Sequence, residues 1–246
     1  MELIISHHVC DLTTLCVCSR TCYSWYIAAV PHLHHNLTTD TISRKITWPS
    51  PLRNAHSLGL LPLVKQLRYR AFHDPFTPEK LGGWTLRYFS ALMNLQELGI
   101  DELVIPDFMP NIQRYFGHFA PTLRLLALRK PIGSSREILY FIGLFPNLQD
   151  LRICYNRPYE EQEGTAGTDL VPLSVPPLCG RLMLVCFTKE KLVEDMITFF
   201  GGLRFRYMEL FRVKGVRLLL GACAATLEGL KLYPNDPYGE EFQRGK

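Results

Sequence analysis

A single hydrophobic pattern, L-x-x-L-x-L, recurs along most of the chain. Four copies are complete, with Ile accepted in the last place, at 95–100, 123–128, 148–153 and 227–232, and three are degenerate, at 64–69, 179–184 and 205–210. The fourth places of successive copies are separated by 31, 28, 25, 31, 26 and 22 residues, and they fall at Leu67, Leu98, Leu126, Leu151, Leu182, Met208 and Leu230. These steps lie near the period of about 20–29 residues that is typical of leucine-rich repeats.

Each copy is predicted to form a strand, and the segments between copies carry helix signals. Ser134 and Glu137 have the spacing of a capping box. Thr77-Pro78-Glu79 supplies an N-cap residue followed by a proline that suits a first helical turn, and Thr188 with Glu190 precedes another apolar run. An Asn or Thr also precedes the first leucine of each complete copy, at Asn94, Thr122, Asn147 and Thr226.

A unit of strand, turn and helix cannot bury its apolar side alone, so neighbouring units are expected to stack. The predicted fold class is α/β, a leucine-rich-repeat solenoid over residues 46–234 with parallel strands and helices on its convex side. The alternative is a compact doubly wound α/β domain, in which strands and helices also alternate. The solenoid is favoured because a doubly wound domain does not require one leucine template in every strand.

Two segments depart from the repeat. Residues 155–177 are rich in acidic residues, glycine and proline, and they are predicted to form an exposed acidic loop inserted between two units. Residues 235–246 are polar and are predicted to be a flexible tail that supplies no capping unit.

Composition and charge agree with an ordinary folded chain. Hydrophobic residues make up 47% and charged residues 20% of the 246 residues, and the 39 leucines fit the repeated template. The net charge of +4 is too small to indicate a nucleic-acid or membrane partner by itself. The apolar stretch at 218–225 is far shorter than the roughly 20 residues of a membrane helix. No signal peptide is recognisable, so an intracellular location, cytoplasmic or nuclear, with reduced cysteines is expected.

Alternate residues of the repeat strands are expected to leave the core and form a concave surface. Basic, acidic and aromatic groups alternate along it, a mixture that suits a folded protein or a peptide better than a polyanion. The predicted partner-binding residues are Arg68, Arg70, Glu97, Asp101, Arg129, Asp150, Arg152, Arg181, Tyr207, Glu209, Phe211, Lys231 and Tyr233.

The N-terminal segment lacks the repeat and has apolar residues at helical spacing, with Asp11 as an N-cap candidate. Three stretches, Leu3 to Ser6, Asp11 to Leu15 and Cys18 to Trp25, resemble the F-box, a helical module that binds the Skp-type adaptor of cullin–RING ubiquitin ligases. The motif of the family opens with a Leu-Pro-x-Glu stretch, and only the last residue of that stretch has a counterpart in this sequence, Glu2. An F-box shortened at its N-terminus is therefore expected over residues 1–45.

The whole pattern, an F-box followed by leucine-rich repeats, is similar to fungal F-box proteins of the basidiomycete type. The resemblance implies a substrate-recognition subunit of an SCF-type ligase, in which the repeats bind a protein substrate. The alternative is a protein-interaction scaffold that has lost adaptor binding. The residues that the resemblance assigns to the adaptor contact are Leu3, Ile4, Ile5, Leu12, Leu15 and Trp25.

Motifs for other chemistry are missing. No P-loop, G-x-G-x-x-G, H-E-x-x-H or G-x-S-x-G motif occurs, so neither an enzyme nor a cofactor is predicted. Cys10, Cys16, Cys18 and Cys22 contain no C-x-x-C pair, and buried thiols are favoured over a zinc site. The basic residues at 201–217 are interpreted as a solvated face rather than a nucleic-acid contact. A nucleic-acid binder would show salt-dependent retention that is lost when Arg204 and Arg206 are neutralised.

Overall fold

The computed structural model describes residues 11–40, 59–70, 89–155, 176–185 and 191–233, and every structural statement below refers to them. The described helices and strands follow the order α2 (Leu12–Thr21), α3 (Tyr23–Leu33), β1 (Asn36–Asp40), η1 (Leu61–Leu63), β2 (Gln66–Arg70), η2 (Phe89–Ala91), β3 (Glu97–Asp101), α6 (Ile105–Phe108), η3 (Met109–Asn111), α7 (Ile112–Phe116), β4 (Leu125–Arg129), α8 (Ser135–Gly143), β5 (Asp150–Cys154), β6 (Leu178–Val185), α9 (Lys191–Phe199), β7 (Leu203–Phe211), α10 (Val216–Cys223) and β8 (Gly229–Tyr233).

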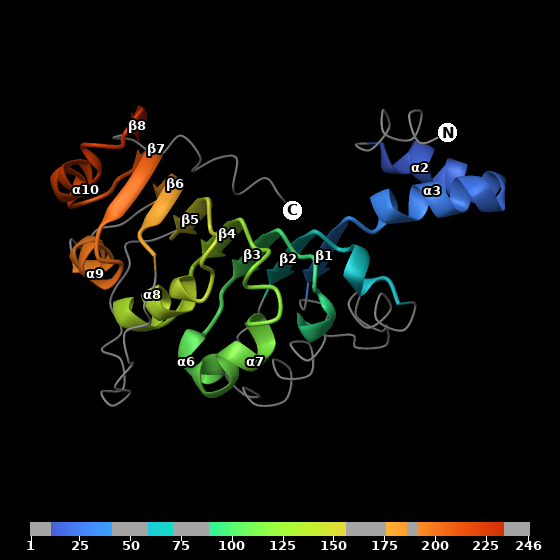
Figure 1. The fold of residues 1–246 in the computed structure, drawn as a ribbon, viewed down its shortest axis with the longest axis horizontal. Helices are drawn as coiled ribbons and strands as arrows, with labels where there is room; N and C mark the ends of the chain where they lie inside the picture. Colours follow the sequence, from blue (N-terminus) through green and yellow to red (C-terminus); the bar gives the residue numbers. More distant parts are fainter. Residues whose placement is uncertain (1–10, 41–58, 71–88, 156–175, 186–190, 234–246) are drawn as a thin grey trace.

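The predicted α/β class is confirmed. The described strands form one eight-stranded sheet in which every neighbouring pair is parallel and the order in space is the order in sequence. A doubly wound sheet reverses its strand order at a switch point, so that alternative does not fit. Figure 1 shows α6 to α10 along one side of the curved row of strands, with α2 and α3 beyond β1.

The strand register reproduces the repeat. The fourth places of the seven copies pair in one unbroken series, from Leu67 with Leu98 through to Met208 with Leu230. A further member, Leu37 of β1, pairs with Leu67. Strand β1 was not predicted, because it contains only one of the template leucines, Leu37. It belongs to the sheet although it lies within the segment assigned by sequence to the N-terminal module.

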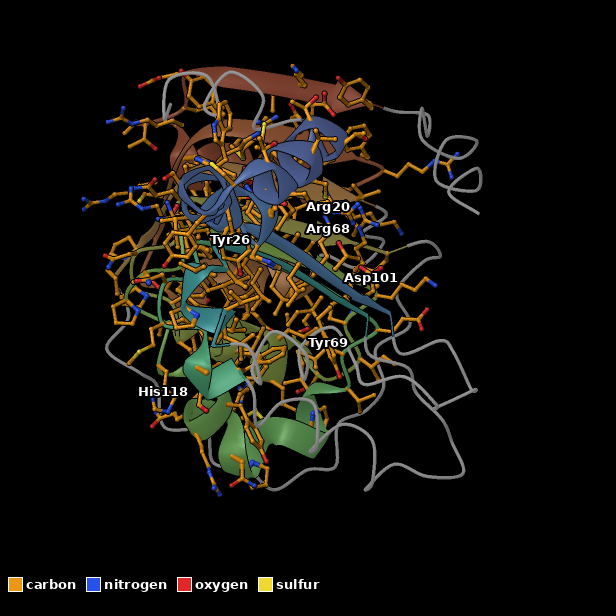
Figure 2. The ribbon with its side chains drawn as sticks, turned by 90° about the vertical axis from the view of Figure 1, so that its right-hand side faces the viewer. Arg20, Tyr26, Arg68, Tyr69, Asp101 and His118 are labelled. Atoms are coloured by element: carbon orange, nitrogen blue, oxygen red, sulfur yellow. The ribbon has the colours of Figure 1, made fainter. Side chains whose placement is uncertain are left out.

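The strands have one buried and one accessible side. In β3, β4 and β5 buried residues alternate with more exposed ones, as expected for a period of two. Figure 2 shows Arg68 and Asp101 on one side of the strands and Tyr69 on the other, the side on which His118 lies. Tyr69 is buried, and its pKa is raised to about 12 by that burial. The accessible side is called the front face below.

Aromatic side chains fill the layer between the sheet and the helices. Phe116 of α7 packs edge to face against Phe89 and Phe141, with ring centroids 5.6 and 5.0 Å apart. Phe119 and Phe145 stack beside them at 6.2 Å. All five rings are buried, so this aromatic row joins successive units of the core.

The recurring Asn or Thr before each complete copy connects neighbouring units. Asn94 Nδ2 donates to the Pro62 carbonyl at 2.9 Å, and Asn147 Nδ2 donates to the Pro121 carbonyl at 2.8 Å. The hydroxyl of Thr122 donates toward the Leu95 carbonyl at 2.8 Å. Thr226 similarly faces the carbonyl of Phe205 at 3.2 Å. Each side chain therefore satisfies a carbonyl of the preceding unit, which explains why the same residue types recur there.

Two predicted helix starts are confirmed. Ser134 and Glu137 form a complete capping box at α8, in which Glu137 Oε2 accepts from the Ser134 backbone N–H at 2.7 Å. Asp11 caps α2 by accepting from the backbone N–H groups of Thr13 and Thr14. The expected caps at Thr77 and Thr188 lie outside the described residues.

Strand β6 differs from the predicted copy. The register shifts between Gly180, which pairs with Phe205, and Arg181, which pairs with Tyr207. Arg206 of β7 is left without a partner position and forms a bulge in that strand. Strand β6 has no extra residue, so its regular alternation buries Leu178 on the same side as Leu182 and Leu184, whereas Cys179, the first place of the sequence template, is exposed. The assignment of Cys179 to a core place was wrong. So was the assignment of Tyr155 to an exposed loop, since it is buried beside β5.

The last strand leaves part of its apolar side uncovered. Leu230 and Leu232 of β8 occupy template places that are buried in the central strands, yet they are 38% and 51% exposed. Helix α10 packs on β7 rather than on β8. The sheet thus ends at β8 without a described element over its final leucines.

Candidate protein-binding face

The partner-binding residues predicted from sequence occupy front-face positions of the strand register, and the side chain of Arg70 is outside the described part of the structure. Their backbone positions lie in three register rows that cross β2 to β8. The first row runs through Gln66, Glu97, Leu125, Asp150, Arg181, Tyr207 and Gly229, the second through Arg68, Gly99, Ala127, Arg152, Met183, Glu209 and Lys231, and the third through Arg70, Asp101, Arg129, Cys154, Val185, Phe211 and Tyr233. The parallel register thus brings residues from distant parts of the chain onto one surface.

Charged side chains in the middle of the front face pair with one another. Within β5, Arg152 donates to Asp150 from Nη2 at 2.6 Å and from Nε at 3.1 Å. The hydrogen bond to Asp150 is the main cause that raises the pKa of Arg152. Arg129 Nε lies 3.7 Å from Asp101 Oδ1. These pairs are partly exposed, so they orient the side chains more than they stabilise the fold.

A three-residue charge cluster spans β6 to β8. Glu209 Oε1 accepts from Arg181 Nη2 at 2.6 Å and lies 3.1 Å from Lys231 Nζ. The side chain of Glu209 is only 13% exposed, whereas those of Arg181 and Lys231 are 43% and 63% exposed. Burial raises the pKa of Glu209, but the hydrogen bonds and charges of Lys231 and Arg181 outweigh it and lower that pKa below 4.5. Glu209 is therefore a carboxylate that holds two cations at the surface.

Tyr207 is an exposed aromatic residue with a fixed position. Its ring lies directly over Gly229, where a Cβ atom would be 2.8 Å from the ring. The phenol donates to Glu228 Oε2 at 2.9 Å, and this hydrogen bond is the main cause that raises its pKa. Arg206 Nε lies 3.7 Å from the same carboxylate group. Tyr207 is 50% exposed and so presents a ring face to a partner.

Phe211 corrects one prediction. It lies on the front face by register but is buried, and its ring stacks on Tyr233 with centroids 4.2 Å apart. It therefore cannot offer the open contact that the sequence suggested. The alternation of β7 alone could not reveal this burial, because it depends on side chains of other segments.

Several residues of the front face were missed. Leu125, Met183 and Val185 are partly exposed, and Gly99 and Ala127 are small, so the middle of the face is less polar than its charged members suggested. Their positions follow from the repeat register, which was available from sequence. The sequence prediction selected only charged and aromatic types and so passed over them.

The N-terminal helices form a pair with a small core of its own. Leu15 of α2 and Ala29 of α3 are buried, and Trp25 packs against them. A direct adaptor contact by Leu15 does not fit this burial, because the side chain faces the helix pair itself. Leu3, Ile4 and Ile5 lie outside the described residues, as does the side chain of Leu12.

Other apolar side chains of this pair are exposed. Val17 of α2 is 62% exposed, and on α3 Tyr23, Tyr26 and Ile27 are exposed. The three α3 residues have the i, i+3, i+4 spacing of one helical face. Sequence reasoning missed them because the family motif drew attention to the residues that form the pair's own core.

Histidines join the helix pair to the sheet. His34 follows the end of α3, and the carbonyl of His35 accepts from the backbone N–H groups of Lys65 and Gln66. Burial lowers the pKa of both imidazoles, and Lys65 lowers that of His35 further. Both histidines are thus favoured in their neutral forms in the folded protein.

Comparisons with known proteins give no family. The scan against family models matched none, and the searches of curated proteins and of solved structures found no match. In the part of the chain that the structure describes, no group of three His, Cys, Asp or Glu side chains is arranged to hold a metal ion. No helix among the described residues has the length and apolarity needed to cross a bilayer.

Replacing Glu209 by Gln is expected to lower stability at neutral pH but not in strong acid. A carboxylate whose folded pKa is lowered stabilises the fold above its ordinary pKa, and this contribution is lost as the pH falls through the folded value. We expect a cost of about 1 kcal/mol at pH 7, because both cations are exposed enough for solvent to screen them. Urea unfolding of both proteins at pH 7 and at steps below 4.5 measures the difference.

Wild type and variant share the acid sensitivity of His34 and His35, whose lowered pKa values destabilise the fold as the pH falls below 6.5. The comparison at each pH removes that contribution. A difference in unfolding free energy that stayed constant down to the lowest pH would contradict the assigned role of Glu209.

Proposed function

We propose that this chain is a protein-recognition subunit whose front face binds a protein target. The observation that carries the proposal is the row arrangement of accessible basic, acidic and aromatic side chains over the whole sheet. Such a mixture matches the composition of protein-binding surfaces, where aromatic residues and arginine are enriched. The repeated, in-register strands support a leucine-rich-repeat solenoid, since each unit contributes the same positions to one surface.

We further propose that the N-terminal helix pair is an F-box-like module that docks a Skp-type adaptor, so that the chain serves an SCF-type cullin–RING ubiquitin ligase. Support comes from the motif resemblance and from the exposed Val17, Tyr23, Tyr26 and Ile27. Large apolar side chains exposed together mark an interaction surface. Enzymatic activity of the chain itself is not part of the proposal.

The second candidate is an interaction scaffold that binds through its repeats and does not assemble a ligase. It is favoured by one observation: Leu15, which the resemblance assigns to the adaptor contact, is buried in the helix pair. The two functions share the front face and differ only at the N-terminal pair. Binding of a purified Skp-type adaptor therefore discriminates them.

The test of the front face exchanges two charges. In the variant Asp150→Arg/Arg152→Asp the ion pair within β5 can re-form, so the fold is expected to persist while the charge pattern seen by a partner is reversed. Recovery of the target from cell extract should then be abolished. A matched control, Glu102→Lys/Lys130→Glu, exchanges the 2.7 Å pair that follows β3 and β4. Unchanged recovery by the β5 variant would refute the assignment of the front face.

The test of adaptor binding uses the same full chain. Val17→Asp and Ile27→Asp are expected to abolish binding of the adaptor and to leave target recovery intact. Failure of the wild-type chain to bind adaptor, with target recovery retained, would leave the scaffold function in place of the ligase function.

A further inference from the structure

We propose that the end of the front face formed by β6, β7 and β8 binds an acidic peptide segment that carries an aromatic or aliphatic side chain. The inference rests on the proposed protein-binding function and names the chemistry of the bound segment. The surface is defined by Arg181, Tyr207, Glu209 and Lys231 and is called the C-terminal patch.

Charge is distributed unevenly over the front face. Among the described side chains of β2 to β5, the register rows contain three basic residues, Arg68, Arg129 and Arg152, and three acidic ones, Glu97, Asp101 and Asp150. Along β6 to β8 the same rows contain two basic positions, Arg181 and Lys231, and one acidic position, Glu209. The carboxylate of Glu228, just before β8, is already engaged by Tyr207 and Arg206. The C-terminal patch is therefore the part of the face where an anionic partner gains most.

The two cations of the patch are held in place before a partner arrives. Glu209 binds both from a largely buried position, while Arg181 and Lys231 themselves remain about half exposed. A guanidinium has five N–H donors and an ammonium has three, and Glu209 engages only one atom of each. The remaining donors can bind an incoming carboxylate, and the fixed cations reduce the entropy lost on binding.

Tyr207 supplies an apolar contact beside these donors. It pairs with Arg181 in the β6–β7 register, and its ring is positioned by Gly229 beneath it and by the hydrogen bond to Glu228. An exposed ring that is already fixed loses little freedom on binding, which is typical of residues that dominate interface energy. An acidic segment with one apolar side chain can use both features together.

A peptide is favoured over a nucleic acid as the occupant. Glu209 and Glu228 lie within or beside the patch, and their carboxylates would repel a continuous row of phosphates. A peptide can place a single carboxylate at Arg181 and Lys231 and leave the space near Glu228 to an uncharged group. Short double-stranded DNA is therefore included in the test as a competing probe.

The experiment measures fluorescence anisotropy of labelled pentapeptides with the full chain. The probe is Glu-Glu-Tyr-Glu-Glu, and Gln-Gln-Tyr-Gln-Gln and Lys-Lys-Tyr-Lys-Lys are its matched peptides. We expect the acidic peptide to bind, and we expect Arg181→Gln, Lys231→Gln and Tyr207→Ala each to weaken it about tenfold, the effect of losing one good interfacial contact. Arg217→Gln, which removes one exposed positive charge from α10, should bind as the wild type does.

Thermal unfolding checks that each variant is folded. If Lys231→Gln does not fold, Lys231→Met takes its place, because it keeps the length of the side chain without the charge. Equal affinity for the acidic and neutral peptides, or equal weakening by Arg217→Gln, would overturn the proposal, and so would tighter binding of DNA than of the acidic peptide. If target recovery depends on the β5 pair but not on the C-terminal patch, this inference fails while the proposed function stands. If no target is recovered at all, the proposed function fails instead.

Discussion

Gly180→Ala is expected to destabilise the fold by about 3 kcal/mol or more, the combined cost of a left-handed alanine and of an overpacked contact. The backbone of Gly180 has φ of +88°, and a Cβ atom there would overlap the carbonyl oxygen of Gln149. That oxygen accepts the backbone N–H of Arg181 at 2.7 Å, so the overlap falls on a hydrogen bond that joins β5 to β6. Urea unfolding followed by circular dichroism measures the loss.

Gly201→Ala is the matched control. Gly201 also has a positive φ, +61°, but a Cβ atom would meet nothing within 4 Å. Its substitution is expected to cost about 1 kcal/mol from backbone conformation alone. If the two variants lost the same stability, close approach of the strands at the bulge would not be the reason that glycine is needed at residue 180.

Phe116→Ala should have the second large effect, a loss of about 4 kcal/mol in the free energy of unfolding, as is typical when a buried aromatic ring is removed. Phe116 is completely buried at the centre of the aromatic row and contacts Phe89, Phe119 and Phe141. The cavity would separate two units of the stack, and the neighbouring rings cannot close it because they are fixed by their own contacts.

Phe199→Ala provides the comparison for the aromatic row. Phe199 lies on α9, is partly exposed and contacts Phe200 edge to face at 5.1 Å. Its loss should cost roughly half as much or less, since fewer buried contacts disappear. Thermal or urea unfolding of both variants measures the loss in the free energy of unfolding. A larger loss for Phe199→Ala than for Phe116→Ala would show that the aromatic row is not the main core.

The sheet register was predictable because one constraint acts on every unit. The template leucines must reach the same buried layer, so their places in the sequence fix how Leu98, Leu126 and Leu151 pair. The first strand escaped prediction since Leu37 alone carries the template there, and its pairing with Leu67 depends on tertiary contact. The bulge at Gly180 escaped for a similar reason, because a local sequence does not reveal a register shift against its neighbour.

The front face was predictable in position but not in detail. Alternation placed Arg152, Glu209 and Lys231 correctly, since side chains of a strand point to opposite sides. Exposure was not predictable in the same way. Phe211 is buried by residues distant in sequence, and the accessible side chains of the helix pair include Tyr23 and Ile27 rather than Leu15. Which residues can touch a partner is thus a property of the assembled surface.

The unbroken parallel register also sets a length scale for any partner. Neighbouring strands lie about 4.8 Å apart, so each register row offers a new side chain at about that interval. One turn of an α-helix advances about 5.4 Å, whereas an extended segment returns a side chain to the same face only after about 6.6 Å. A helix lying across the strands could therefore keep step with several units of one row, from Arg152 to Lys231, while an extended segment in the same direction would fall out of step after two or three.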